Sequence, residues 1–473
     1  MNETSINAKT VFTQKLTGRQ RLFLRSPAYS VAMVARIQGN ISLEALKQAI
    51  HRVQRRHMML QVRVVTDKNG DPWFTADEFA AIPVRQMTRA SADHWQQVCL
   101  NEYQVPFEMD KRPLIRFILL YSPDVSDLLV FCQHSICDGM SLAYLLHDIL
   151  EHLNDPDRRV ESLPPPLVLE ESIPSKFLQS RTTRLLGKLL FSRHNRKWTR
   201  AGITFDSEDA KDLFSAYWNH HELRMSSCTV EGEKLSRLIS SSRGEGISVN
   251  TALTTAFQAA LFEIKRTENA RFLPNVNIAI DLRRELSSSA KRGFGLYATG
   301  ADCKLQYDPG RSFWENATRF HRLIQRKIEL DKNYRRLALL KHLDPRMMEA
   351  LPFVRYSKYV PPEAARFDKL ARFDEMAASL VPRAFRRLTR LSTSLMVTNL
   401  GRLPFAAEYG QLRVKELFCV PPSAASTEIV VGVVTVSDKL NISICYLENV
   451  IGSSTVEKIK HQAMGYLDTA TAA

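Results

Sequence analysis

The sequence predicts an α+β protein in which strands and helices pack in layers. Strand-like stretches, such as the run from Leu60 to Val65, and helix-like stretches, such as Trp314 to Leu330, occur in both halves of the chain. They do not alternate regularly, which argues against a doubly wound parallel sheet. Between the halves, residues 161–175 contain four prolines, three of them consecutive, which exclude a continuous helix. We therefore expect an N-terminal subdomain over residues 1–165 and a C-terminal subdomain over residues 166–473.

The composition is that of a large globular protein. The chain has 473 residues, of which 44% are hydrophobic and 24% are charged. The longest apolar stretch, Ile429 to Val436, has the length of a strand rather than of a membrane span. Residues 1–9 lack the apolar core of a signal peptide. The seven cysteines are scattered without CxxC pairs, which favours free thiols in a reducing cytoplasm.

A strand, a turn and a helix follow one another around His134. Leu128 to Phe131 forms an apolar run typical of a buried strand, and a helical pattern of leucines starts near Ser141. The junction between them holds His134, Asp138 and Gly139. A histidine at a strand end, before a tight turn, is well placed to point into a channel. Its ordinary pKa of about 6.5 lets it accept a proton at neutral pH.

Two other interpretations of this junction remain. The first is a histidine that simply satisfies hydrogen bonds at the end of a strand. The second is a metal site, because Cys132, His134, Cys137 and Asp138 lie close together in the sequence. No second Cys and His cluster with zinc-ligand spacing occurs elsewhere in the sequence, which argues against a metal.

Two stretches of the C-terminal half offer further candidate residues. The alternating run from Asn275 to Ile280 leads to Asp281, Leu282 and Arg283, and Arg283 falls on the face opposite the apolar side chains. An arginine placed there can bind a carboxylate through two hydrogen bonds, or it can be an ordinary surface residue. Asn399 and Gly401 follow a second strand pattern, where turn residues are the simplest expectation.

The chain is strongly basic, with a formal net charge of +15 and an isoelectric point near 9.5. Two stretches, Lys176 to Arg200 and Pro382 to Arg390, contain many basic residues and no acidic ones. They are interpreted as a solvated face, as a surface for an acidic carrier protein or for the phosphates of coenzyme A, or as a peripheral contact with anionic lipid. The sequence holds no nucleic-acid recognition motif, so specific nucleic-acid binding is not expected.

Five motifs in order give the chain a resemblance to a known superfamily. His134-Ser-Ile-Cys-Asp138-Gly139 resembles the HxxxDG motif of the chloramphenicol acetyltransferase-like superfamily, which includes condensation domains and polyketide-associated (Pap-type) and alcohol acyltransferases. The other four motifs are similar to its first helix with the RHxxLR strand start, to FDLxxxPLxR, and to the DLR and TNLG motifs of the Pap-type and alcohol acyltransferase branch. They are residues 41–60, 107–116, 280–283 and 397–401. The resemblance runs from about Leu16 to about Leu467.

Three departures from the family pattern are visible. Gln61 stands where arginine is usual, and Gln133 replaces the first histidine of the common HHxxxDG form. The second change puts local packing in question rather than chemistry, because the family's base is the second histidine. The DFGWG motif of plant-type BAHD enzymes is absent.

The resemblance implies two chloramphenicol acetyltransferase-like subdomains arranged as a V-shaped pseudo-dimer with a central tunnel. It implies an acyltransferase in lipid or natural-product biosynthesis, in which His134 is the general base and Asp138 pairs structurally with Arg283. The donor is a thioester of coenzyme A or of a phosphopantetheine-bearing carrier protein, the acceptor is a small alcohol or amine, and no cofactor is needed. A monomer is expected.

Donors for the oxyanion are expected around the same site. The candidates are the N–H of Gly139 and the hydroxyls of Ser394 or Thr398, with Asn399 beside them in the tunnel. The alternative is a non-catalytic member of the same fold that docks a carrier protein or partner enzyme.

Overall fold

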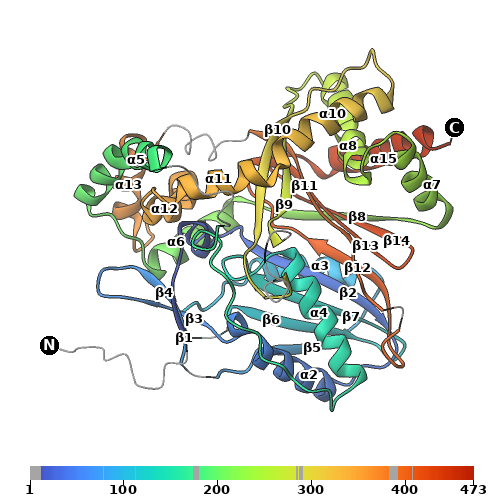
Figure 1. Ribbon diagram of the computed structural model, residues 1–473, viewed down its shortest axis with the longest axis horizontal. Coiled ribbons are helices and arrows are strands. Elements are labelled where there is room, and N and C mark those ends of the chain that lie inside the picture. Colours follow the sequence, from blue (N-terminus) through green and yellow to red (C-terminus); the bar gives the residue numbers. More distant parts are fainter. Residues whose placement is uncertain are drawn as a thin grey trace.

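The computed structural model describes residues 12–472 except 78, 112, 174–180, 284–285, 287–290, 383–391 and 407. Two large mixed sheets dominate it, one built mainly from N-terminal strands and the other from C-terminal strands (Figure 1). Helices cover these sheets. The predicted α+β class is confirmed. No helix within the described ranges is long and apolar enough to cross a membrane.

The N-terminal sheet has five strands. Its order is β12 (Arg413–Val420), β2 (Ser30–Gln38), β7 (Val125–Gln133), β6 (Ile115–Tyr121) and β5 (Val84–Thr88). β7 pairs antiparallel with both β2 and β6 and is buried over nearly its whole length. Apolar residues on both faces of such a strand require cover on both sides. One face packs against α2 (Leu43–Arg56) and α4 (Gly139–Asn154), and the other packs against α3 (His94–Tyr103).

The C-terminal sheet has six strands, in which β11 runs parallel to both β9 and β13 and the other pairs are antiparallel. Its order is β10 (Ala298–Lys304), β9 (Asn275–Asp281), β11 (Thr393–Arg402), β13 (Thr427–Val436), β14 (Lys439–Leu447) and β8 (Leu223–Glu231). Its apolar core also contains residues of α7 (Gly232–Gly244), α8 (Val249–Thr267), α10 (Phe313–Ile328) and α15 (Ser453–Ala470).

A small sheet and a group of helices complete the structure. The small sheet has the order β1 (Phe12–Lys15), β4 (Pro72–Ala76) and β3 (Arg63–Thr66). The helices are α1 (Gly18–Leu24), α5 (Arg181–Ala201), α6 (Ser207–His220), α11 (Leu330–Leu340), α12 (Pro345–Tyr356) and α13 (Phe367–Leu380), with short 3₁₀ turns η1 (Met58–Leu60) and η4 (Ser357–Tyr359).

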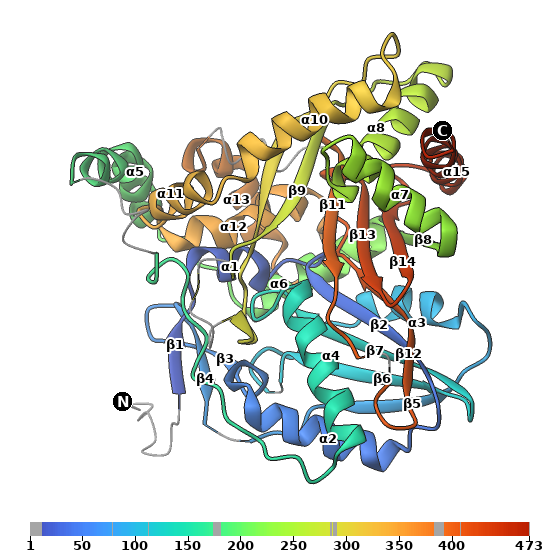
Figure 2. The same ribbon diagram turned by 45° about the vertical axis from the view of Figure 1, so that its right-hand side comes forward.

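One strand crosses between the two halves of the sequence. Figure 2 shows β12, which belongs to the C-terminal half, lying beside β2 at the edge of the N-terminal sheet. Arg36 on β2 binds Glu416 of β12 at 2.7 Å and Asp127 of β7 at 2.8 Å, so ion pairs join all three strands. The expected C-terminal subdomain, residues 166–473, therefore contributes a strand to the N-terminal sheet.

Candidate functional site

His134 lies directly after β7, in the turn that leads into α4. Its backbone N–H donates to the carbonyl of Tyr29 at 3.2 Å, which continues the pairing between β2 and β7. Its ring Nδ1 lies 2.7 Å from the carbonyl oxygen of Cys137. A carbonyl only accepts hydrogen bonds, so Nδ1 carries the proton. In the neutral ring, Nε2 is then left with a free lone pair. The side chain is partly exposed.

The surroundings of His134 favour its neutral form. Burial lowers the pKa of His134 below its ordinary value, while the hydrogen bond to Cys137 and the charge of Asp138 act in the opposite direction. The Phe23 ring stacks on the imidazole, with centroids 4.4 Å apart and planes 18° apart. An unprotonated Nε2, held by stacking on one side and by a backbone hydrogen bond on the other, is the form a general base requires.

Gln133 connects the strand end to helix α1. Its side-chain amide donates to the carbonyl oxygens of Phe23 at 2.7 Å and Leu24 at 3.1 Å. Its side-chain oxygen accepts from the N–H of Ser135 at 2.5 Å. The side-chain amide of Gln133 thus links α1, which carries Phe23, to the turn that holds His134.

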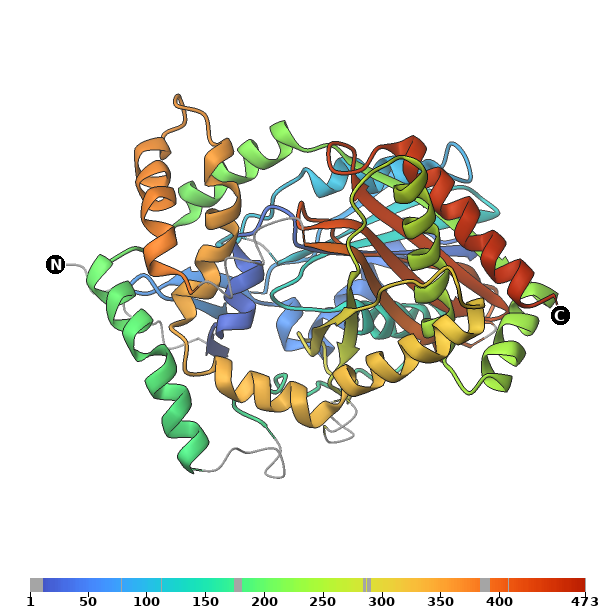
Figure 3. The same cartoon turned by 90° about the horizontal axis from the view of Figure 1, so that it is seen from above.

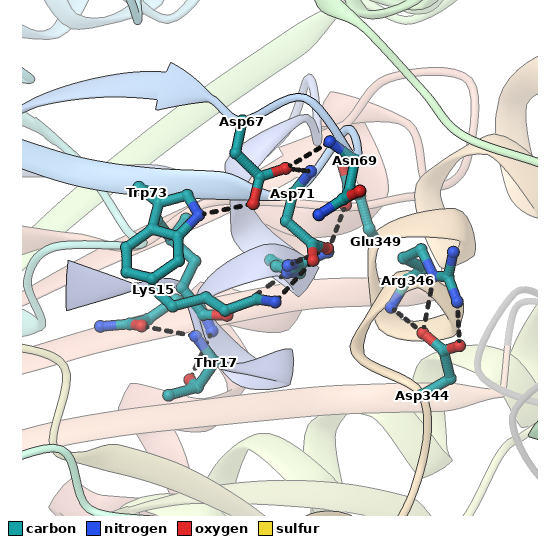
Figure 4. Close-up of polar contacts among 12 residues, drawn as sticks. Lys15, Thr17, Asp67, Asn69, Asp71, Trp73, Asp344, Arg346 and Glu349 are labelled. Carbon is teal, nitrogen blue, oxygen red and sulfur yellow. Dashed lines mark hydrogen bonds and ion pairs between the residues drawn. The ribbon is translucent and has the colours of Figure 1, made fainter. Parts of the chain in front are cut away.

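Helix α1 is held on its other side by buried charges. The fully buried Arg21 binds Asp71 at 2.7 Å and Glu349 of α12 at 3.5 Å. Figure 4 shows Asp71 in the loop between β3 and β4, pointing toward Lys15, to which it is paired at 2.5 Å. These contacts fix α1 between the small sheet and α12, and so fix the position of Phe23 beside His134.

Asp138 and Arg283 form a buried pair between the two halves of the chain. The guanidinium binds the carboxylate through two hydrogen bonds, Nη1 to Oδ2 at 2.8 Å and Nη2 to Oδ1 at 2.9 Å. The carboxylate also accepts from the N–H of Ser141 at 2.9 Å, which caps α4, and from the N–H of Tyr297 at 2.8 Å. Burial alone would raise the pKa of Asp138, but Arg283 and these N–H groups lower it.

Arg283 has further partners that the sequence did not predict. Its Nη2 lies 2.7 Å from the hydroxyl of Ser141, its Nη1 lies 3.1 Å from Asp281, and its guanidinium stacks on the Tyr297 ring at 4.4 Å. The Ser141 hydroxyl in turn donates to the carbonyl of Gly295. A serine three residues after the cap of α4 was the available signal for this contact, but spacing alone does not identify a partner 142 residues away.

Gly139 lies where a C-terminal strand approaches the start of α4. A Cβ at this position would come within 3.0 Å of the Leu400 side chain on β11 and 3.6 Å of Cys419 Sγ on β12. Glycine therefore allows the close approach of these strands. Thr398 lies on the same strand, two residues before Leu400, and the register of β11 with β13 shifts between Asn399 and Arg402.

The other two candidates on β11 have different roles. Ser394 is fully buried, and its hydroxyl contacts Gln258 at 3.2 Å and the carbonyl of Asn275 at 3.1 Å. It lies six residues before Leu400, or about 20 Å along a strand, so Ser394 is not available to an oxyanion at His134. Asn399 and Gly401 lie inside β11, not in a turn after it as the sequence suggested: the side chain of Asn399 accepts from the N–H of Gly401 at 2.7 Å, where the register with β13 shifts.

The cysteines near His134 belong to the core. Cys132 and Cys137 are fully buried, and both thiols contact the carbonyl of Gln133, at 3.7 and 3.6 Å. Burial raises the pKa of Cys137, which disfavours the thiolate that a metal would bind. Of the two basic stretches, Arg383, Arg386, Arg387 and Arg390 lie outside the described residues.

Comparison with known proteins finds a family model that matches the part of the chain around His134. Residues 12–157 match the family model "Condensation domain". Phosphinothricin tripeptide synthetase PhsC of Streptomyces viridochromogenes is 27% identical over 151 residues, which cover 30% of this chain and 14% of that protein. Nonribosomal peptide synthetase 5 of Gibberella zeae is 27% identical over 143 residues, which cover 30% of this chain and 1% of that protein. The match thus spans only a small part of these relatives.

Solved structures extend the likeness to nearly the whole chain. The first condensation domain of the calcium-dependent antibiotic synthetase matches with a TM-score of 0.60 at 15% identity, covering 98% of this chain and 97% of that one. Polyketide synthase associated protein 5 from Mycobacterium tuberculosis matches with a TM-score of 0.60 at 12% identity, covering 97% and 98%. Residues 12–157 are thus similar to the condensation-domain family, and nearly the whole chain shares the fold of these solved structures.

Proposed function

We propose that the chain moves an acyl group from a thioester to an alcohol or amine, with His134 as the general base. The observation that carries the proposal is the hydrogen bond from His134 Nδ1 to the Cys137 carbonyl, which leaves Nε2 free to accept a proton. The condensation-domain match supports acyl transfer in natural-product biosynthesis.

The proposed reaction needs only the thioester donor, the acceptor and His134. Nε2 of His134 takes the proton of the acceptor O–H or N–H as the acceptor's oxygen or nitrogen attacks the thioester carbonyl. The tetrahedral intermediate then collapses, the C–S bond breaks, and the imidazolium returns its proton to the departing thiolate. The products are an ester or amide and a free thiol. The donor is already activated, so no covalent acyl-enzyme, metal or redox cofactor is required.

The neighbouring residues hold the base and stabilise charge. Asp138 and Arg283 fix the start of α4 against the C-terminal half and do not touch the reacting atoms in this proposal. The Gly139 N–H, at the first turn of α4, and the Thr398 hydroxyl are the candidate donors to the oxyanion. The central tunnel, with donor and acceptor entering from opposite sides, remains a prediction.

The donor can be tested with two matched thioesters. Octanoyl-CoA and an acyl carrier protein loaded with octanoyl-phosphopantetheine carry the same acyl group on different scaffolds. We expect the purified chain to release free thiol from at least one of them, to water or to an added acceptor amine such as a glycine ester. The His134→Ala variant should release thiol at least about 100-fold more slowly. The relatives named as peptide synthetases support the carrier protein as the preferred donor.

The same experiment separates catalysis from docking. If the chain binds the loaded carrier protein in a pull-down but shows no His134-dependent thiol release, it is a non-catalytic docking module. Such a result would overturn the proposed function and leave the fold assignment intact.

The pH profile of the reaction should report the lowered pKa of His134. Only the neutral ring accepts a proton, and burial lowers the pKa of His134 below 6.5. We therefore expect kcat/KM to fall on the acidic side, with a midpoint below pH 6.5. The residual rate of His134→Ala should lack this acidic limb. A midpoint above pH 7 in the wild-type profile would contradict the lowered pKa of His134.

A further inference from the structure

Helix α5 is fixed to the rest of the molecule through its C-terminal half. Trp198 is fully buried and Phe191 is almost so, and the Trp198 ring meets Phe373 of α13 at 6.2 Å. Asn195 donates to the carbonyl of His342 at 2.9 Å and accepts from the N–H of Asp344 at 3.1 Å. Residues 191, 195 and 198 share one side of the helix, so the opposite side faces away from the protein.

The N-terminal half of α5 exposes leucines. Leu185, Leu189 and Leu190 are 60%, 61% and 60% exposed, more than any other large apolar side chain in the described part of the chain. Figure 3 shows this end of α5, next to the grey trace, projecting away from the sheets. Three leucines within two turns at a projecting helix end form a concentrated apolar surface in contact with water.

The same helix carries positive charge only. Seven Lys and Arg residues and no Asp or Glu lie between Arg181 and Ala201, and the nearest acidic residues are Glu171 and Asp206. Five of the basic side chains are exposed, and none forms an ion pair with a described residue. They are Lys188, Arg193, Arg196, Lys197 and Arg200. Arg196 and Arg200 lie on the same side of the helix as Leu185 and Leu189.

We propose that α5 binds the surface of an anionic lipid bilayer. The projecting leucines enter the interface, and the basic side chains further along the same outward side contact the lipid phosphates. A helix with leucines, basic residues and no acidic ones has the composition of an interfacial helix. A second copy of the chain is disfavoured as the occupant, because two such helices facing each other across a two-fold axis would repel. An acidic carrier protein would match the positive charges, but charge attraction alone does not remove the exposed leucines from water.

A flotation experiment with defined vesicles tests this proposal. The full chain is mixed with vesicles of phosphatidylcholine alone or with 30% phosphatidylserine, at low and at physiological salt. We expect the protein to float with the phosphatidylserine vesicles, and the bound fraction to fall several-fold with added salt and with pure phosphatidylcholine. The Leu185→Ser, Leu189→Ser, Leu190→Ser triple variant and the Arg193→Glu, Arg196→Glu, Lys197→Glu triple variant should each lower it at least tenfold.

Control substitutions outside α5 test whether vesicle binding depends on α5 itself. Leu323→Ser on α10 and Lys458→Glu on α15 alter an exposed leucine and an exposed lysine outside α5, and should leave binding unchanged. All variants change exposed side chains, so their melting temperatures should match the wild type. No flotation with phosphatidylserine vesicles, or equal flotation of the α5 and control variants, would overturn the proposal. Binding of an acidic carrier protein that requires α5, without vesicle binding, would assign the helix to a protein partner instead.

Discussion

Replacing His134 by alanine is expected to lower the rate of acyl transfer by a factor of about 10²–10⁴. The reason is the loss of the ring nitrogen whose free lone pair is oriented by a backbone hydrogen bond. The fold should survive, because the His134 side chain is only partly buried. The measurements are thiol release under saturating octanoyl donor and a thermal melting curve of the same sample.

His51→Ala is the matched control for this change. His51 is an exposed histidine on α2, so its removal should alter neither the rate nor the melting temperature. If the His134 variant keeps near wild-type turnover, another group must take the acceptor proton. A large drop in melting temperature for His134→Ala would instead assign the residue a structural role.

Replacing Asp138 by alanine is expected to destabilise the protein by about 3–5 kcal/mol. The change leaves the buried Arg283 guanidinium without the carboxylate that now binds it at two points, and it removes the cap of α4. Activity should fall as well, because α4 begins directly after the turn that holds His134. Chemical denaturation and thermal melting measure the effect, with Asp468→Ala, at an exposed pair with Lys234, as the control.

A double variant separates the loss of attraction from the stranded charge. Asp138→Ala combined with Arg283→Met removes both charges and fills part of the space with an apolar side chain. We expect this double variant to be more stable than Asp138→Ala alone, since no buried charge is left unpaired. Strictly additive losses, or an Asp138→Ala variant as stable as the wild type, would show that the pair does not hold the two halves together.

The sequence predicted the central features of the site because they are local or carried by motifs. The apolar strand before His134 and the helix after Asp138 follow from hydrophobic periodicity. The contact between Asp138 and Arg283 came from the family resemblance, and the structure brings the two side chains together. Their separation of 145 residues explains why periodicity alone could not have paired them.

The features that escaped prediction depend on which distant segments meet. Alternation in β12 shows which side chains share a face, but it does not show that the strand joins β2 in the other sheet. The stacking of Phe23 on His134 depends on the buried ion pairs of Arg21, which join three segments far apart in the sequence. Ser394 was a candidate donor to the oxyanion, whereas the strand carries its hydroxyl into the core beside Gln258.

The most direct test of the account is the protonation state of His134, read by NMR of protein labelled with ¹⁵N-histidine. The His134 signals are assigned by their absence from the His134→Ala spectrum. The structure predicts a neutral ring at pH 7 with the proton on Nδ1, donated to Cys137, and a titration midpoint below 6.5. A ring that is charged at pH 7, or that carries its proton on Nε2, would leave no lone pair for the acceptor and would contradict His134 as the base.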